Sequence, residues 1–224
     1  LPLPEDRFNI HRPVSIYLDG LIRMERLDEA YALALEIQLA RVPPVFVQHA
    51  LDASEKLVAA GRNTRALALL GIVPLREEDE ALQALLMEYA GLFRSGENLD
   101  EALVLYDRIR SLPGGEYFKE ALLWTAYCNV RLDRTESARL FLAEARPIAS
   151  RDAEFSLHQL VLARIELKDG NYRAALEEVS QGVVFSRIGY EWIPELLYTS
   201  ALCYEALGNP STARTVYEQI ILFF

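Results

Sequence analysis

The side chains that most often perform catalysis or bind metals are few in this sequence and lie far apart. Its three histidines, His11, His49 and His158, show none of the short spacings that are typical of metal ligands. The sequence contains no nucleophile elbow, phosphate-binding glycine loop or dinucleotide-binding fingerprint. It therefore predicts a protein that is not an enzyme and that needs no cofactor or metal.

The cysteines and the acidic runs have structural explanations. Cys128 and Cys203 each fall inside a predicted helix, where a cysteine behaves as a small core residue. The acidic run Glu77–Glu80 precedes a predicted helix, and the pairs Asp28–Glu29 and Asp100–Glu101 open two others. The helix dipole favours negative charge at these places. None of these groups has a distinctive partner for acid–base catalysis.

The composition excludes several classes of protein. With 51% hydrophobic and 25% charged residues, the 224-residue chain is too apolar for a disordered protein. Its net charge of −10 argues against a nucleic-acid binder, which usually has a basic surface. The longest nearly unbroken apolar stretch, residues 66–75, is too short to cross a bilayer. We expect a soluble protein without membrane insertion, in the cytoplasm or, as the chemistry also permits, in a periplasm.

A repeat organises the chain. A turn-like segment followed by an alanine at a fixed position recurs six times. The successive alanines are separated by 36, 36, 36, 37 and 38 residues. We call these the anchor alanines: Ala30, Ala66, Ala102, Ala138, Ala175 and Ala213. A second small residue lies twelve positions before most of them, and only the first unit departs, with Leu18. Small residues at fixed spacing indicate helices that cross closely, because bulk there would push the axes beyond about 8–10 Å.

Each unit is predicted to form two antiparallel helices. Apolar residues recur at steps of three and four before and after each turn, as in 197–204 and 213–220, while strand-type alternation is almost absent. Four glycines fall where first helices should end, and glycine adopts the left-handed conformation there at low cost. They are Gly61, Gly96, Gly170 and Gly208. Pro13 and Pro210 are expected in the first turn of a helix.

These residues resemble the tetratricopeptide repeat (TPR) family. The sixth unit matches the family's core spacings best, with Leu197, Ser200, Ala201, Tyr204, Gly208, Ala213, Tyr217 and Ile220. The resemblance implies an all-α fold, a right-handed α-solenoid of antiparallel helix pairs, after an extended lead-in over residues 1–12. The array would span 13–224, with repeats at 13–42, 43–75, 76–113, 114–150, 151–187 and 188–224.

The resemblance also implies a concave groove lined by the first helix of each pair. Its geometry assigns to this groove Met87, Arg94, Trp124, Tyr127, Arg131, Leu160, Arg164, Lys168 and Tyr198. Aromatic side chains beside arginines are typical of binding hot spots, which favours an acidic or C-terminal peptide with an apolar anchor as the partner. The alternative is that Trp124 and Tyr127 are buried packing residues and that the basic groups form a solvated face. Acidic residues in the first two units exclude the carboxylate clamp of chaperone-tail-binding members.

The end of the chain is apolar, with no polar cap after Ile220. We expect the natural chain to continue into another helix; alternatively, Leu222, Phe223 and Phe224 contact a partner or a second copy. The predicted function is a non-enzymatic scaffold that binds a peptide or protein segment, as part of a larger protein. The alternatives are a structural or oligomerisation module, and a docking region for an enzyme whose catalytic domain lies outside this chain.

Overall fold

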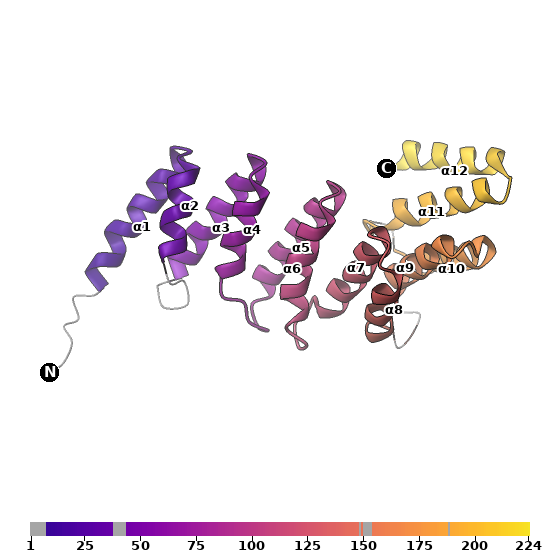
Figure 1. The fold of residues 1–224 in the computed structure, drawn as a ribbon, viewed down its shortest axis with the longest axis horizontal. Coiled ribbons are helices and arrows are strands. Elements are labelled where there is room, and N and C mark those ends of the chain that lie inside the picture. The colour runs from indigo at the N-terminus through magenta and orange to yellow at the C-terminus, as the bar shows by residue number, and fades with distance from the viewer. Residues whose placement is uncertain (1–7, 38–43, 148, 150–153, 188) are drawn as a thin grey trace. The chain divides into compact units, whose positions relative to one another are not determined.

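The computed structural model describes residues 8–37, 44–147, 149, 154–187 and 189–224 (Figure 1). Within these residues every regular element is an α-helix. The helices are α1 (Phe8–Arg23), α2 (Leu27–Glu36), α3 (Pro44–Ala59), α4 (Asn63–Ile72), α5 (Glu80–Ser95), α6 (Leu99–Arg110), α7 (Phe118–Arg131), α8 (Thr135–Glu144), α9 (Phe155–Lys168), α10 (Tyr172–Val184), α11 (Ile193–Ala206) and α12 (Pro210–Phe223).

Contacts divide the chain into two compact units, Leu1–Leu105 and Tyr106–Phe224, and the division falls within α6. In the first unit α1 packs on α2 and α3, and α4 packs on α2 and α3. In the second unit α7 packs on α8 and α9, α9 on α10 and α11, and α11 on α12. Among these helices, consecutive ones thus pair within each unit, and the first helices of neighbouring pairs pack side by side. The predicted all-α class of packed helix pairs is confirmed.

The turn inside every helix pair has the same backbone geometry. One residue adopts a left-handed conformation five positions before each anchor alanine, and these residues are Glu25, Gly61, Glu97, Asp133, Gly170 and Gly208. The second pair shows the hydrogen bonds: the Arg62 amide donates to the Leu57 carbonyl at 2.8 Å and the Gly61 amide to the Val58 carbonyl at 2.9 Å. This is the Schellman motif, which satisfies the last carbonyl groups of a helix.

Two expectations about helix ends are wrong. Gly96 has a φ of −83°, and the next residue, Glu97, takes the left-handed conformation with a φ of 62°. The turn geometry is therefore set by the distance to the anchor alanine, even where the glycine lies one position away. At the other end of the chain, α1 begins at Phe8, so Pro13 lies inside this helix and not in its first turn. Residues 8–12 are thus helical, while 1–7 lie outside the described residues.

The anchor alanines lie at the centre of the core. Five of the six have no exposed surface, and Ala213 is 1% exposed. The residues twelve positions earlier are equally buried, from Leu18 and Ser54 in the first unit to Ala201 in the second. The small side chains therefore lie where helices pack most closely, as the spacing predicted.

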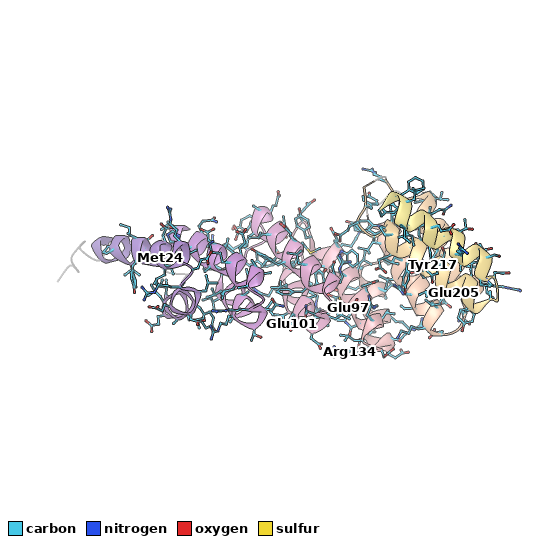
Figure 2. All side chains as sticks on the ribbon, turned by 90° about the horizontal axis from the view of Figure 1, so that it is seen from above. Met24, Glu97, Glu101, Arg134, Glu205 and Tyr217 are labelled. Atoms are coloured by element: carbon cyan, nitrogen blue, oxygen red, sulfur yellow. The ribbon has the colours of Figure 1, made fainter. Side chains whose placement is uncertain are left out.

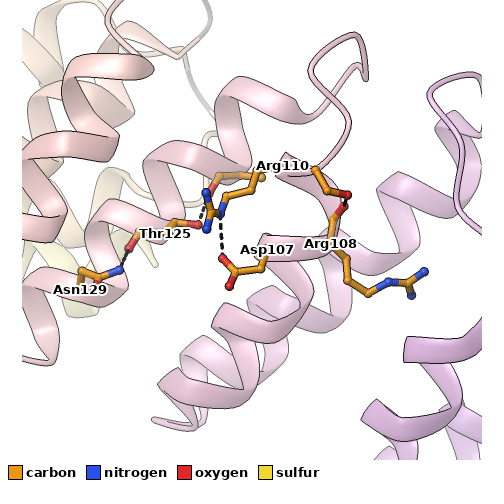
Figure 3. Close-up of polar contacts among 7 residues, drawn as sticks. Asp107, Arg108, Arg110, Thr125 and Asn129 are labelled. Carbon is orange, nitrogen blue, oxygen red and sulfur yellow. Dashed lines mark hydrogen bonds and ion pairs between the residues drawn. The ribbon is translucent and has the colours of Figure 1, made fainter.

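Helix α7 is the most deeply buried helix among the described residues, since all ten side chains from Ala121 to Val130 are buried. Its polar residues are satisfied by the helix itself: the Thr125 hydroxyl donates to the Ala121 carbonyl at 2.7 Å, and the Asn129 amide donates to the Thr125 carbonyl at 2.8 Å (Figure 3). Such bonds allow a polar side chain to sit in an apolar core without an unpaired donor.

Helices α9, α10 and α11 approach one another closely at Gly182 on α10. A Cβ atom built on this residue would lie 2.9 Å from Leu196 Cδ2 on α11 and 3.2 Å from Gln159 Cβ on α9. The Gly182 carbonyl accepts a hydrogen bond of 2.8 Å from the Ser156 hydroxyl, which in turn accepts one of 3.0 Å from the Trp192 indole. Three helices therefore meet at a position that has no room for a side chain.

We expect Glu25→Gly to stabilise the protein by about 0.5–1 kcal/mol, because a left-handed backbone costs a residue with a side chain roughly that much more than glycine. The reverse change in the neighbouring turn, Gly61→Ala, should destabilise it by about 1 kcal/mol, since Gly61 has a φ of 69° and no steric neighbour. Urea unfolding followed by circular dichroism measures both. Shifts of the same sign would contradict the shared turn geometry.

We expect Gly182→Ala to destabilise the protein by about 1–3 kcal/mol, because the added methyl group overpacks the contact with Leu196 and Gln159. Gly71→Ala is the matched control, since Gly71 is a helical glycine on α4 with open space around its Cβ position. This control should be neutral or stabilising by up to about 1 kcal/mol. Thermal unfolding of the two variants would contradict the close approach if both gained stability.

Candidate interaction face

The residues that the sequence assigned to a groove are divided between the two units. Met87 and Arg94 lie half-buried on α5 in the first unit. The other seven lie in the second unit, on the first helices α7, α9 and α11, which pack in that order. The candidate interaction face is therefore taken from the second unit by itself.

The seven residues differ in what they can contact. Trp124 and Tyr127 are each 1% exposed, and Leu160 has no exposed surface, so these side chains are packing residues. Arg164 is 8% exposed. A partner can reach Arg131, which is half-buried, and Lys168 and Tyr198, which are exposed. Together with half-buried Leu167 and Leu202, these three form what we call the first-helix face, namely Arg131, Leu167, Lys168, Tyr198 and Leu202.

A carboxylate that the sequence did not single out organises the polar side of this face. Glu195, in the first turn of α11, accepts hydrogen bonds from the Tyr127 hydroxyl at 2.9 Å and from Arg164 at 2.6 Å. Arg131 donates to the Tyr127 hydroxyl at 3.2 Å. Burial acts to raise the pKa of Glu195, but the Arg164 charge and these hydrogen bonds outweigh it and lower the pKa. Glu195 is therefore ionised at neutral pH and holds Arg164 in place.

Aromatic contacts fix the ring of Tyr198. The Arg164 guanidinium lies over this ring at 5.5 Å and over the Tyr127 ring at 5.9 Å, both within cation–π range. From α12, the Tyr217 ring approaches the Tyr198 ring at 5.9 Å between centroids. Tyr217 also hydrogen-bonds Glu205 on α11, and Figure 2 labels both residues. Tyr198 is thus supported by charged and aromatic neighbours while 41% of its surface stays exposed.

Buried aromatic residues support the face from behind. The Trp124 ring makes edge-to-face contacts with Tyr127 at 5.4 Å and with Trp192 at 6.1 Å. Its indole donates to Glu120 at 3.2 Å. These contacts join α7 to the start of α11, so that the backbone carrying Tyr198 is held by a packed cluster.

The chain's own carboxylates offset much of the positive charge on this face. Arg164 pairs with Glu195, and Lys168 pairs with Asp133 in the turn before α8. Because both pairs are satisfied within the unit, a partner carboxylate would have to compete with them. The face therefore combines an exposed aromatic ring and leucine side chains with a nearly balanced set of charges.

The remaining reactive groups do not converge. Cys128 and Cys203 are both buried, and burial raises the pKa of the Cys203 thiol to about 11. In the described part of the chain no group of three or more His, Cys, Asp or Glu side chains could hold a metal ion. Among the described helices, none has both the length and the apolar character needed to span a bilayer.

Comparison with known proteins bears on the fold. Residues 195–223 match the sequence model of the tetratricopeptide repeat. A tetratricopeptide repeat protein from Parabacteroides merdae ATCC 43184 is similar in structure, with a TM-score of 0.57 and 15% identity over 95% of this chain and 79% of that one. BtubC (BKLC) from P. vanneervenii gives a TM-score of 0.55 and 15% identity, over 91% of this chain and 89% of its own.

No curated protein matches the sequence significantly. The sequence match is confined to the last helix pair, α11 and α12, whereas the structural similarity extends over nearly the whole chain. Folds of this kind generally serve as scaffolds for protein interaction. The resemblance predicted from the anchor alanines is therefore confirmed at the level of the repeat match and the fold: the last helix pair matches the tetratricopeptide repeat model, and the fold of the chain is similar to that of a solved tetratricopeptide repeat protein.

Proposed function

We propose that the first-helix face binds a segment of a partner protein and that the chain acts as a non-enzymatic scaffold. The observation that carries this proposal is the exposed ring of Tyr198, held by Arg164 and Tyr217. A tyrosine already fixed by its neighbours loses little conformational entropy on binding. Tyrosine and arginine are also the residue types most enriched in binding hot spots.

Apolar contact should supply most of the affinity. Leu202 lies one helical turn after Tyr198, so the two side chains share one face of α11 and can hold a single apolar anchor. Arg131 and Lys168 then lie beside the anchor, where an acidic side chain of the partner could pair with them. This pairing adds little, because exposed ion pairs contribute only about 0–1 kcal/mol and salt screens them. The net charge of −10 also opposes a strongly acidic partner at long range.

A second candidate function is oligomerisation through the end of α12. Ile221, Leu222, Phe223 and Phe224 are 83%, 74%, 70% and 64% exposed. If this surface joins two copies, light scattering should show a mass that rises with concentration, and Phe223→Ser should return it to the monomer mass. A monomer mass at every concentration would exclude this alternative.

We expect Tyr198→Ala to weaken binding of a selected peptide by roughly thirtyfold, the loss of about 2 kcal/mol that defines a hot spot. Random displayed peptides are selected against the intact chain, and the affinity of the best binder is then measured by calorimetry for each variant. Tyr17→Ala is the matched control, because Tyr17 is 53% exposed on α1 in the other unit.

Binding should also change little between low and moderate salt, because most of the affinity comes from apolar contact and exposed ion pairs contribute little. Peptides that lose affinity with Tyr17→Ala but not with Tyr198→Ala or Leu202→Ser would overturn the proposed face. Unfolding curves of the same variants separate lost binding from lost structure. Tyr198 and Tyr17 are both exposed, so neither change should cost much stability.

A further inference from the structure

The second unit also has a hollow, and the residues that line it lie outside the first-helix face. Its volume is about 270 Å³. One wall is a single face of α9, because its lining residues Phe155, His158, Gln159 and Leu162 follow the helical spacing of three and four. Arg146 and Pro147, after the end of α8, also line this hollow. None of these residues belongs to the predicted groove.

A chain of hydrogen bonds fixes the polar groups in this hollow. Gln159 is 4% exposed, and its amide nitrogen donates to Glu178 and, at 3.2 Å, to Gln181. Both amide hydrogens are therefore used, and the Gln159 oxygen must accept the remaining bond, 3.1 Å long, from His158 Nδ1. His158 Nδ1 therefore carries a hydrogen atom. The other nitrogen of the ring is Nε2.

His158 Nε2 is a hydrogen-bond acceptor in this arrangement. Burial lowers the pKa of His158 and the nearby Arg146 charge lowers it further, and together they outweigh the opposing effect of the hydrogen bond to Gln159, so the ring is neutral at neutral pH. A neutral ring with its hydrogen on Nδ1 has a lone pair on Nε2. Within the described residues Nε2 has no hydrogen-bond partner, and it is not sealed from solvent.

The ligand chemistry follows by elimination. A carboxylate or a fully ionised phosphate can only accept hydrogen bonds, so it would suit Arg146 but oppose the lone pair of His158. An ammonium group can only donate, and the Arg146 charge would repel it. A hydroxyl group does both, because it can donate to His158 Nε2 while it accepts from Arg146.

The apolar lining of the hollow favours a hydroxyl group that is attached to an aromatic ring. Phe155 and Leu162 provide apolar wall, and Phe185, itself 46% exposed, meets the Phe155 ring edge to face at 5.3 Å. We propose that this hollow is a second binding site, which takes the phenol side chain of a tyrosine on a partner protein. The hydroxyl pairs with His158 and Arg146, and the ring packs on Phe155 and Leu162.

The test uses the intact chain and three soluble probes: the N-acetyl amides of tyrosine, phenylalanine and phosphotyrosine. Amide chemical shifts are followed by NMR during each titration. We expect saturable shifts in the first two turns of α9, with tyrosine binding about fivefold more tightly than phenylalanine, as one net hydrogen bond would give. Phosphotyrosine should bind more weakly than tyrosine.

Variants identify the groups responsible. His158→Phe should abolish the preference for tyrosine over phenylalanine, and Arg146→Gln should reduce it. Arg173→Gln on α10 is the matched control and should leave it unchanged, because Arg173, like Arg146, is exposed. Arg146 lies at the surface, so its variant keeps the test valid even if His158→Phe lowers stability.

Several results would overturn this site: equal affinities for tyrosine and phenylalanine, no saturable binding, tighter binding of phosphotyrosine, or an Arg173→Gln effect as large as that of Arg146→Gln. Shifts confined to Tyr198 and its neighbours on α11 would also overturn it, while supporting the first-helix face. Loss of peptide binding in Tyr198→Ala with normal tyrosine binding at α9 would leave this site standing. The two proposals can therefore fail separately.

Discussion

Two helices can approach to the lower end of the usual range of about 8–10 Å between axes only where the side chains between them are small. In this chain that condition is met at the anchor alanines, which are almost without exposed surface in all six helix pairs. A helix pair alone would leave one apolar side uncovered, and packing on the next pair covers it. Each repeat therefore depends on its alanine for internal packing and on its neighbours for burial.

The same constraint sets the turns. Once the alanine fixes where the second helix crosses the first, the chain must reverse over a constant number of residues. The left-handed residue accordingly lies five positions before the alanine in every pair, including the three pairs in which it is glutamate or aspartate. Ion pairs between neighbouring turns, such as Arg62 with Asp28 at 2.6 Å, lie at the surface and contribute far less than this packing.

The features that depend on periodic packing could be predicted from the sequence. The alanine spacing predicted the helix pairs, and the residues that pack at the crossings are buried as expected. Features that depend on one local arrangement could not. Gly96 looked like the left-handed residue because glycine usually is, yet Glu97 occupies the required position. Pro13 looked like a helix start, but α1 begins earlier.

The first-helix face likewise has some features that the sequence could predict and others that it could not. Repeat geometry placed Trp124, Tyr127 and Tyr198 on the first helices, but it could not tell which would be exposed, because that depends on how α7, α9 and α11 pack together. Glu195 was missed for a related reason. Its position, in the first turn of α11, does not belong to the periodic groove pattern, and an acidic residue there is ordinarily explained by the helix dipole.

Glu195 shows how a single carboxylate can change the character of a surface. Without it, Arg164, whose side chain is largely removed from water, would lose the carboxylate with which it pairs. Such a charge is costly unless it is paired. With Glu195 in place, the charge of Arg164 is neutralised and its guanidinium supports the Tyr198 ring. What remains exposed is mainly an aromatic and apolar surface, so contact area and fit, more than charge, decide what this face can hold.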